Sequence, residues 1–401
     1  MNKLNVGKDL YLKGRIGWRG LAKEEYLKNS NYRIINGTAL EDKCINWNKC
    51  GYITQSRYEE SPEIMLQEKD ILISKDGTLG KIGYVEDVSI PSTVASGIFV
   101  MRNITPKKLD SDYLYHFLKS NIFKNFINRM KASGSTINHL YQRDLSQLEL
   151  DLPSLKTQQK IANVLSTIDA KIELNNKMNK ELEDMAKLIY DYWFVQFDFP
   201  NKKGKPYKSS GGKMVYNEKL KREIPEGWEV KKLEDVATVK KGTLITKKQA
   251  NEKGKVKVVS AGINFSYYHD TPNNKEFTIT VSASGANAGY INFWKEPIFA
   301  NDCTTIYNDK LGMTIMILFY LQIHQEYLFN QTKGSAQPHV YPKDIQNIWI
   351  PLPSLELINQ FHLKEEKLFN KKRIITRENQ QLTELRDWLL PMLMNGQVTI
   401  A

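Results

Sequence analysis

The feature that most constrains the fold of this 401-residue chain is an internal repeat with an offset of 200 residues. Residues 134–155 read GSTINHLYQRDLSQLELDLPSL, and residues 334–355 read GSAQPHVYPKDIQNIWIPLPSL. Nine of the 22 aligned positions are identical, and the alignment needs no gap. A period of half the chain is far longer than that of a solenoid repeat. The sequence therefore predicts two copies of one folding unit.

Each copy of the repeat leads into about 40 residues that contain almost no Gly or Pro until the far end. Alternate steps of four and three separate the positions of an apolar stripe, which is the spacing of a seam between two packed helices. We predict long helices over about 156–195 and 355–394, each roughly 60 Å long, with Ser154 and Ser354 as N-caps. The expected seam residues are Ile161, Leu165, Ile168, Ile172, Asn179, Leu182, Ile189, Leu368, Ile375, Asn379, Leu382 and Leu389.

The two stripes favour pairing of the helices with each other. A single stripe of this kind more often belongs to an ordinary core helix, but each of two matched stripes needs a long apolar partner. Helices that follow similar domains can fold back antiparallel, which would give an approximate two-fold axis. Asn179 and Asn379 fall at equivalent places in the stripes, where a buried polar residue usually sets register rather than adding stability.

The segments outside these helices predict two mixed domains. Short β-type runs alternate with Gly-containing turns, and each domain has an amphipathic helical stretch near its end. We expect two mixed domains at 1–152 and 225–352, long helices within 153–198 and 353–401, and a solvated Lys/Ser/Gly/Pro-rich linker at 199–224. The fold class is α/β (α+β), with two similar domains joined by two antiparallel helices that form a coiled coil.

Composition narrows the classes of partner. The 57 Lys and Arg residues outnumber the 45 Asp and Glu residues, so the net charge is +12 and favours a polyanion such as nucleic acid. No apolar run is long enough to span a bilayer, and the N-terminus has no signal core. Three cysteines without C-x-x-C spacing make a disulfide framework or a zinc ribbon improbable. We expect a reduced, cytoplasmic setting.

The sequence lacks the common catalytic motifs. It contains no G-x-x-x-x-G-K-[ST] phosphate loop, no Asn- or Asp-Pro-Pro-aromatic motif for methylation of base amino groups, and no H-E-x-x-H. His139 and His339 recur in both halves, which favours a shared structural role because catalysis rarely needs two copies. We therefore predict no catalytic residue, no metal site and no cofactor.

Taken together, these segments resemble the DNA-specificity subunits of type I restriction–modification systems. The resemblance depends on the order domain, helix, domain, helix, and on the H-[LV]-Y-x-[KR]-D segment that leads into L-P-S-L. YDYWFVQFDFP at 190–200 and IPEGW at 224–228, followed by Leu233, add to it. It covers essentially the whole chain. The first domain lacks the P-x-G-W opening, so we expect its N-terminal edge to differ.

The resemblance implies a non-catalytic subunit that binds double-stranded DNA. Each domain would read half of a split target with a fixed unread gap. The helices would act as spacer and as docking platform for two modification (methyltransferase) subunits. Two restriction (nuclease/translocase) subunits would join afterwards. No membrane partner is implied.

The repeat also sorts the candidate DNA contacts. Two half-sites usually differ, so base-reading residues should lie in loops that diverge between the domains, whereas His139, Tyr141, Asp144 and their repeats should be scaffold or phosphate contacts. Arg and Lys suit guanine, Asn suits adenine, and hydroxyls suit either. The candidates are Arg15, Trp18, Arg19, Arg57, Tyr58, Lys75, Thr78, Lys241, Thr243, Lys247, Tyr267, Tyr268, Ser284 and Asn287.

Two other functions remain open at this point. The chain could be an enzyme with its own nuclease or transferase site, which metal-dependent cleavage or methyl transfer by the isolated chain would reveal. It could also be a scaffold or transcriptional regulator that binds DNA without a modification partner. A neighbouring methyltransferase gene would argue against the second function.

Overall fold

The computed structural model describes residues 2–16, 20–41, 45–132, 139–251, 253–330 and 338–400. Contacts divide the chain into two compact units. Unit 1 comprises Met1–Asn176 and Arg377–Ala401, and unit 2 comprises Lys177–Thr376. Each unit therefore combines one globular domain with parts of both long helices.

The described residues of unit 1 form three sheets. Their strand orders are β2-β8-β5-β6, β4-β3-β7 and β1-β9, and all pairs are antiparallel except β3 with β7. The strands are β1 (Asn2–Asn5), β2 (Leu10–Gly14), β3 (Tyr32–Ile35), β4 (Gly51–Ile53), β5 (Ile71–Ser74), β6 (Ile82–Tyr84), β7 (Ser92–Val94), β8 (Ile98–Asn103) and β9 (Glu149–Leu152). The short helices are α1 (Val6–Asp9), α2 (Gln55–Glu59), α3 (Ser111–Lys119), α4 (Asn121–Ala132) and α5 (Gln142–Leu145), with 3-10 turns at Lys23–Glu25, Trp47–Lys49 and Pro62–Ile64.

Unit 2 repeats this topology strand for strand. Its orders are β13-β19-β16-β17, β15-β14-β18 and β12-β20, again with one parallel pair, β14 with β18. The strands are β12 (Glu229–Lys232), β13 (Thr238–Lys241), β14 (Val256–Val259), β15 (Tyr267–His269), β16 (Thr278–Ser282), β17 (Ile291–Trp294), β18 (Ile298–Ala300), β19 (Cys303–Tyr307) and β20 (Trp349–Leu352). The helices are α7 (Leu233–Val236), α8 (Leu311–Ile323), α9 (Gln325–Asn330) and α10 (Pro342–Gln346), with 3-10 turns at Lys247–Gln249 and Gly285–Asn287.

The local sequence explains the central elements of both units. Every residue of β5 and of β16 is buried, as expected for strands in the middle of a sheet that is covered on both faces. Asp110 caps α3 by accepting a hydrogen bond from the amide of Tyr113 at 2.9 Å. The helix α8 is apolar on almost all sides and is buried over most of its length.

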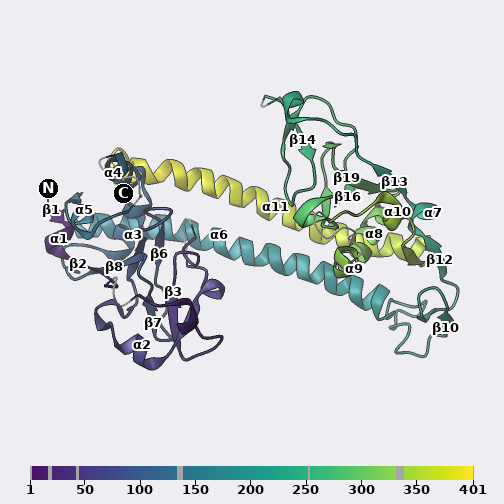
Figure 1. Cartoon of the computed structure of the whole chain (residues 1–401), viewed down its shortest axis with the longest axis horizontal. Helices are drawn as coiled ribbons and strands as arrows, with labels where there is room; N and C mark the ends of the chain where they lie inside the picture. Colours follow the sequence, from purple (N-terminus) through teal and green to yellow (C-terminus); the bar gives the residue numbers. More distant parts are fainter. Residues whose placement is uncertain are drawn as a thin grey trace. The chain divides into compact units, whose positions relative to one another are not determined.

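The long helices begin where the sequence predicts. Helix α6 spans Leu155–Tyr190 and continues as a π-helical turn at Asp191–Val195, and helix α11 spans Leu355–Met394 (Figure 1). The hydroxyl of Ser154 accepts a hydrogen bond from the amide of Thr157 at 3.2 Å, and the hydroxyl of Ser354 accepts one from the amide of Leu357 at 3.3 Å. The predicted fold class, two mixed domains with long helices, is confirmed.

The two long helices pair antiparallel within each unit. In unit 1, Asp169 pairs with Arg386 and Asn175 hydrogen-bonds Asn379. In unit 2, Glu183 pairs with Lys372. The residue numbers of the partners on α11 thus decrease as the residue numbers on α6 increase, which is the pattern of antiparallel packing.

The segment between α6 and the second domain is partly structured. It contains the hairpin β10 (Met214–Asn217) and β11 (Arg222–Pro225). Phe199 stacks on Tyr207 and on Trp228, with ring centroids 4.7 and 5.6 Å apart. This aromatic stack fixes the start of the segment predicted as a linker, whose residues 202–206 and 208–211 remain mostly exposed.

Candidate DNA-binding surface

The loops between β5 and β6 and between β16 and β17 occupy equivalent positions in the two units. In each loop, the last residue of the preceding strand hydrogen-bonds the last residue of the loop. The amide of Ser74 donates to the carbonyl of Lys81 at 3.0 Å, and the amide of Ser282 donates to the carbonyl of Tyr290 at 2.9 Å. Glycines with positive φ, Gly77 (67°) and Gly285 (76°), turn both tips. The two loops are therefore copies of one element.

Four candidate contacts lie on these equivalent loops. Lys75 and Thr78 belong to the loop of unit 1, and Ser284 and Asn287 belong to that of unit 2. Thr78 is exposed and the other three are half-buried. Burial lowers the pKa of Lys75, whose ammonium lies over the ring of Phe99 at 5.0 Å from its centroid. The strand order thus assigns these candidates to equivalent loops, although they do not match at the sequence offset of 200.

The ends of β2 and β13 form a second equivalent pair, but their candidates differ in exposure. Lys241 and Thr243 are exposed. Arg15, in contrast, is only 1% exposed, and its guanidinium donates to the carbonyl of Val94 and the hydroxyl of Ser61 at 3.2 and 3.4 Å. In this conformation Arg15 braces the interior of unit 1 and cannot reach a base edge. The repeat could not reveal this, because burial depends on strands far away in sequence.

Two further candidates of unit 1, Arg57 and Tyr58, lie on α2. Arg57 is half-buried and forms ion pairs with Glu25, at 2.8 Å, and with Glu60. Tyr58 packs against Tyr32 with ring centroids 5.0 Å apart. Trp18 and Arg19 lie outside the described residues. Arg57 would have to exchange an ion pair to contact a phosphate or a base.

The remaining candidates of unit 2 lie on β15 and on the 3-10 turn at Lys247–Gln249. Lys247 is exposed, and Tyr267 and Tyr268 are half-buried. The hydroxyl of Tyr267 donates to the carbonyl of Ile245 at 3.4 Å, which ties β15 to the segment after β13. Tyr267 therefore lies beside the segment that carries Thr243 and Lys247, whereas the ring of Tyr268 packs against Phe265 with centroids 4.9 Å apart.

Comparison with known proteins gives a consistent result. The family model described as "Type I restriction modification DNA specificity domain" matches residues 18–184 and 225–384, one copy in each half. The chain belongs to this family. It is similar to the type I restriction enzyme MjaIX specificity subunit of Methanocaldococcus jannaschii, with 29% identity over 87% of this chain and 84% of the relative. The chain is also similar to the HindI specificity subunit of Haemophilus influenzae, with 24% identity over 72% of this chain and 77% of the relative.

A solved structure supports the fold. The type I restriction–modification system S subunit from M. genitalium aligns with a TM-score of 0.62 and 20% identity, over 98% of this chain and 95% of that one. Within the described part of this chain, no helix is long and apolar enough to cross a membrane. The described residues also contain no cluster of three or more side chains suited to a metal ion.

The residues that the sequence predicts for the seam lie on α6 and α11. All twelve are buried or half-buried. The polar centre is richer than expected: Asn175 is buried and donates to Asn379 and Glu378, both at 2.9 Å, while Asn179 donates to Thr376 at 3.3 Å. Asn379 therefore pairs with Asn175, and its repeat partner Asn179 has a different neighbour. Amide pairs of this kind tie the helices at one register.

The junction of the first specificity domain with the helices is a charge network. Asp169 of α6 forms ion pairs with Lys119 of α3 and Arg386 of α11, both at 2.8 Å. Burial acts to raise the pKa of Asp169, but the two cations outweigh it and hold the pKa below its ordinary value. His116 lies beside this network and shares a hydrogen bond of 2.9 Å with Ser166; burial and Lys119 lower its pKa to about 4.

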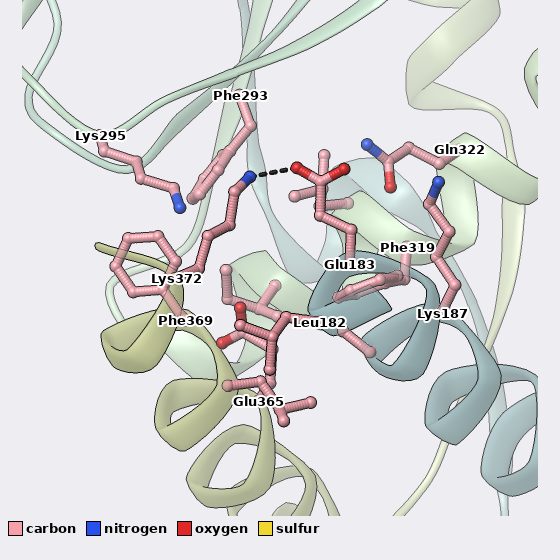
Figure 2. A pocket seen from close by; sticks show the side chains of 14 residues that line it. Leu182, Glu183, Lys187, Phe293, Lys295, Phe319, Gln322, Glu365, Phe369 and Lys372 are labelled. Carbon is pink, nitrogen blue, oxygen red and sulfur yellow. Dashed lines mark hydrogen bonds and ion pairs between the residues drawn. The ribbon is translucent and has the colours of Figure 1, made fainter. Parts of the chain in front are cut away.

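The equivalent junction of the second domain lacks this charge network and contains a cavity of about 330 Å³ that is lined by both apolar and charged side chains. Two hundred residues on, Lys119 and Asp169 are replaced by Phe319 and Phe369, and Ala186 stands where Arg386 stands in unit 1. Figure 2 shows Lys295 beside Phe369, with the Glu183–Lys372 ion pair across the opening. Burial lowers the pKa of Lys295 to about 8. Sequence reasoning missed both junctions because neither set of residues is contiguous.

The outer faces of the helices carry exposed apolar side chains that repeat at the offset of 200. Leu174, Leu385 and Trp388 belong to unit 1, and Ile374, Met185 and Leu188 to unit 2; each is between 45% and 67% exposed. At 100° per residue these positions share one flank of each helix, away from the seam. Each unit therefore presents one copy of the same apolar triplet.

Proposed function

We propose that this chain is the non-catalytic DNA-specificity subunit of a type I restriction–modification complex. It recognises a bipartite duplex target, and each unit reads one half. The observation that carries the proposal is the duplication itself: two units share one strand order, yet their equivalent loops carry different side chains. A scaffold that is kept while its contact residues diverge suits two different half-sites read by one fold.

The candidate contacts that remain accessible suit this role. Thr78, Lys241, Thr243 and Lys247 are exposed, and they combine cations for phosphates with hydroxyls for base edges. The net charge of +12 adds attraction to DNA that is independent of sequence. We propose these residues with Arg57, Tyr58, Lys75, Tyr267, Tyr268, Ser284 and Asn287 as the DNA-binding set.

The long helices supply the spacing in this proposal. Their seam holds one register through the amides of Asn175, Asn179 and Asn379, so the distance between the half-sites would be fixed by helix length. Two-fold related readers commonly span about 34–36 Å, one turn of DNA. The gap between the half-sites would then remain unread.

We propose the repeated apolar triplets as the docking faces for two modification subunits, one on each unit. Because the triplets match at an offset of 200, each face suits a copy of the same partner. Trp388 and Leu188 are the expected anchors, since exposed large apolar side chains mark interaction surfaces. The methyl-transfer and cleavage steps belong to partner subunits, with restriction subunits joining the assembled complex in the cytoplasm.

The experiment is methylation by the reconstituted complex of this chain with the modification subunit of the same system. Sequencing of methylated DNA from cells with and without the gene would first define the target. A bipartite target that disappears with the gene is the expected result. Methyl transfer or cleavage by the isolated chain, or a complex without preference for any bipartite duplex, would overturn the proposal.

A further inference from the structure

Each unit has a carboxylate at the base of this loop, but the two units take it from different chain segments. In unit 1 it lies on the loop itself, and in unit 2 it lies at the end of a neighbouring strand. The loops can be aligned residue by residue through their backbone hydrogen bonds. The amide of Lys75 donates to the carbonyl of Gly97 at 2.9 Å, and that of Ala283 to the carbonyl of Asp302 at 3.3 Å. Asp76 is therefore equivalent to Ser284, and Gly97 is equivalent to Asp302.

The exchange is reciprocal. Unit 1 has Asp on the loop and Gly on the neighbouring strand end, whereas unit 2 has Ser on the loop and Asp on the strand end. A Cβ built on Gly97 would lie 3.4 Å from Oδ2 of Asp76, so a side chain at position 97 would point to the place that the Asp76 carboxylate occupies. In unit 2 the Asp302 carboxylate accepts a hydrogen bond from the hydroxyl of Ser284.

Both carboxylates stabilise the same crossing of chain segments. Asp76 forms a β-bridge with His139 and also binds the imidazole of His139 through its carboxylate. Ser284 forms the equivalent bridge with His339, and the Asp302 carboxylate holds Ser284. The left-handed glycine that turns the tip follows immediately in both loops, at Gly77 and Gly285. The carboxylate thus anchors the base of the loop that carries Thr78 or Asn287.

We propose that Asp76 and Asp302 are equivalent positioning residues, each of which fixes the DNA-reading loop of its own unit. The inference rests on the proposed function, because it assigns these loops to half-site recognition. The shared role explains why unit 2 has Ser284 in place of Asp76 and, at the same time, Asp302 in place of Gly97. A compensated pair is expected where a charged acceptor is needed at one point in space and either strand can supply it.

The test is a double-mutant cycle in unit 1, made in the full complex with the modification subunit. The variants are Asp76→Ser, Gly97→Asp and the combination of both, which copies the arrangement of unit 2. Gly97 does not have a left-handed φ, so its backbone accepts Asp. The measured quantity is the ratio of methylation rates on the target and on duplexes altered in one half-site. A melting curve for each variant monitors folding.

We expect Asp76→Ser to lower discrimination at the half-site read by unit 1 about tenfold, which is typical for loss of a charge-assisted hydrogen bond. Discrimination at the other half-site should not change. The double variant should recover to within about threefold of wild type, although Gly97→Asp alone crowds two carboxylates together. A purely architectural role would reduce discrimination at both half-sites together with stability.

Two outcomes would overturn the inference. One is unchanged discrimination by Asp76→Ser, and the other is a double variant no better than the weaker single variant. Asp302→Gly in unit 2 removes the equivalent carboxylate without replacing a proposed DNA contact. It is the matched control, and it should lower discrimination only at the other half-site. A wild-type complex without bipartite preference would instead refute the proposed function, before any variant is compared.

Discussion

Acidification is expected to destabilise unit 1 through His116. This imidazole is buried and uncharged, and it faces Ser166, Asp112, Lys119, Asp169 and Arg386. Burial and the Lys119 ammonium lower its pKa from 6.5 to about 4. In the unfolded chain the imidazole takes up a proton near pH 6.5, whereas in the folded unit it does so only near pH 4.

The unfolded state therefore binds more protons across this window, and stability falls as the pH is lowered through it. Stability is retained above pH 6.5 and lost progressively toward pH 4. The difference between the two pKa values corresponds to about 3 kcal/mol of free energy of unfolding, as an order of magnitude. That is a large part of the total stability of a typical domain.

The chain itself offers the matched variant. Position 316, which lies 200 residues on, is a buried methionine on the equivalent helix α8. His116→Met should remove the extra loss of stability between pH 6.5 and pH 4 while leaving unit 2 unchanged. Urea titrations at each pH, read by pulsed hydrogen exchange of the peptides 111–119 and 311–323, would report the two units separately. If wild type and His116→Met lose the same free energy in unit 1 over this range, the reasoning is wrong.

Three further predictions concern the junction, the docking faces and the spacer. Asp169→Asn should destabilise unit 1 by about 3 kcal/mol because it removes the carboxylate that the nearly buried cations of Lys119 and Arg386 share, although Arg386 keeps its ion pair with Asp387. The set found in unit 2, Lys119→Phe with Asp169→Phe and Arg386→Ala, should be close to neutral. Urea unfolding distinguishes the two variants, and equal losses of stability would contradict this view of the network. Trp388→Ser should weaken binding at one docking face by about thirtyfold or more, so that the complex loses one of its two modification subunits. Ile104→Ser changes an exposed apolar residue outside the helices and should leave both subunits bound. Native mass spectrometry of the complex counts the subunits, and two modification subunits bound to the Trp388→Ser variant would exclude this face. Deleting seven residues from each long helix should shorten the unread gap by about 10 Å, or about three base pairs, and leave both half-sites unchanged. Methylome sequencing measures both the gap and the half-sites. Altered half-sites would contradict the division between domains that read DNA and helices that set the spacing.

Much of the architecture could be predicted from sequence because it depends on periodic or repeated patterns. The match of 134–155 with 334–355 identified the duplication, and the steps of four and three located both long helices. Ser154 and Ser354 marked the helix starts because a cap needs only a hydroxyl next to the first turn. Each of these signals is local, or is a comparison of the chain with itself.

What the tertiary structure alone decided is which side chains meet. Arg15 was a reasonable candidate for a DNA contact in a Gly-flanked basic segment, yet β7 and the turn at Ser61 enclose its guanidinium. Asp76 and Asp302 occupy non-matching positions in the sequence, and only the strand pairing shows that they serve equivalent loops. Repeats and periods reveal what the backbone does, because backbone conformation responds to neighbours along the chain. Ion pairs, burial and compensating exchanges depend on residues brought together across strands and helices, and no one-dimensional spacing encodes those distances.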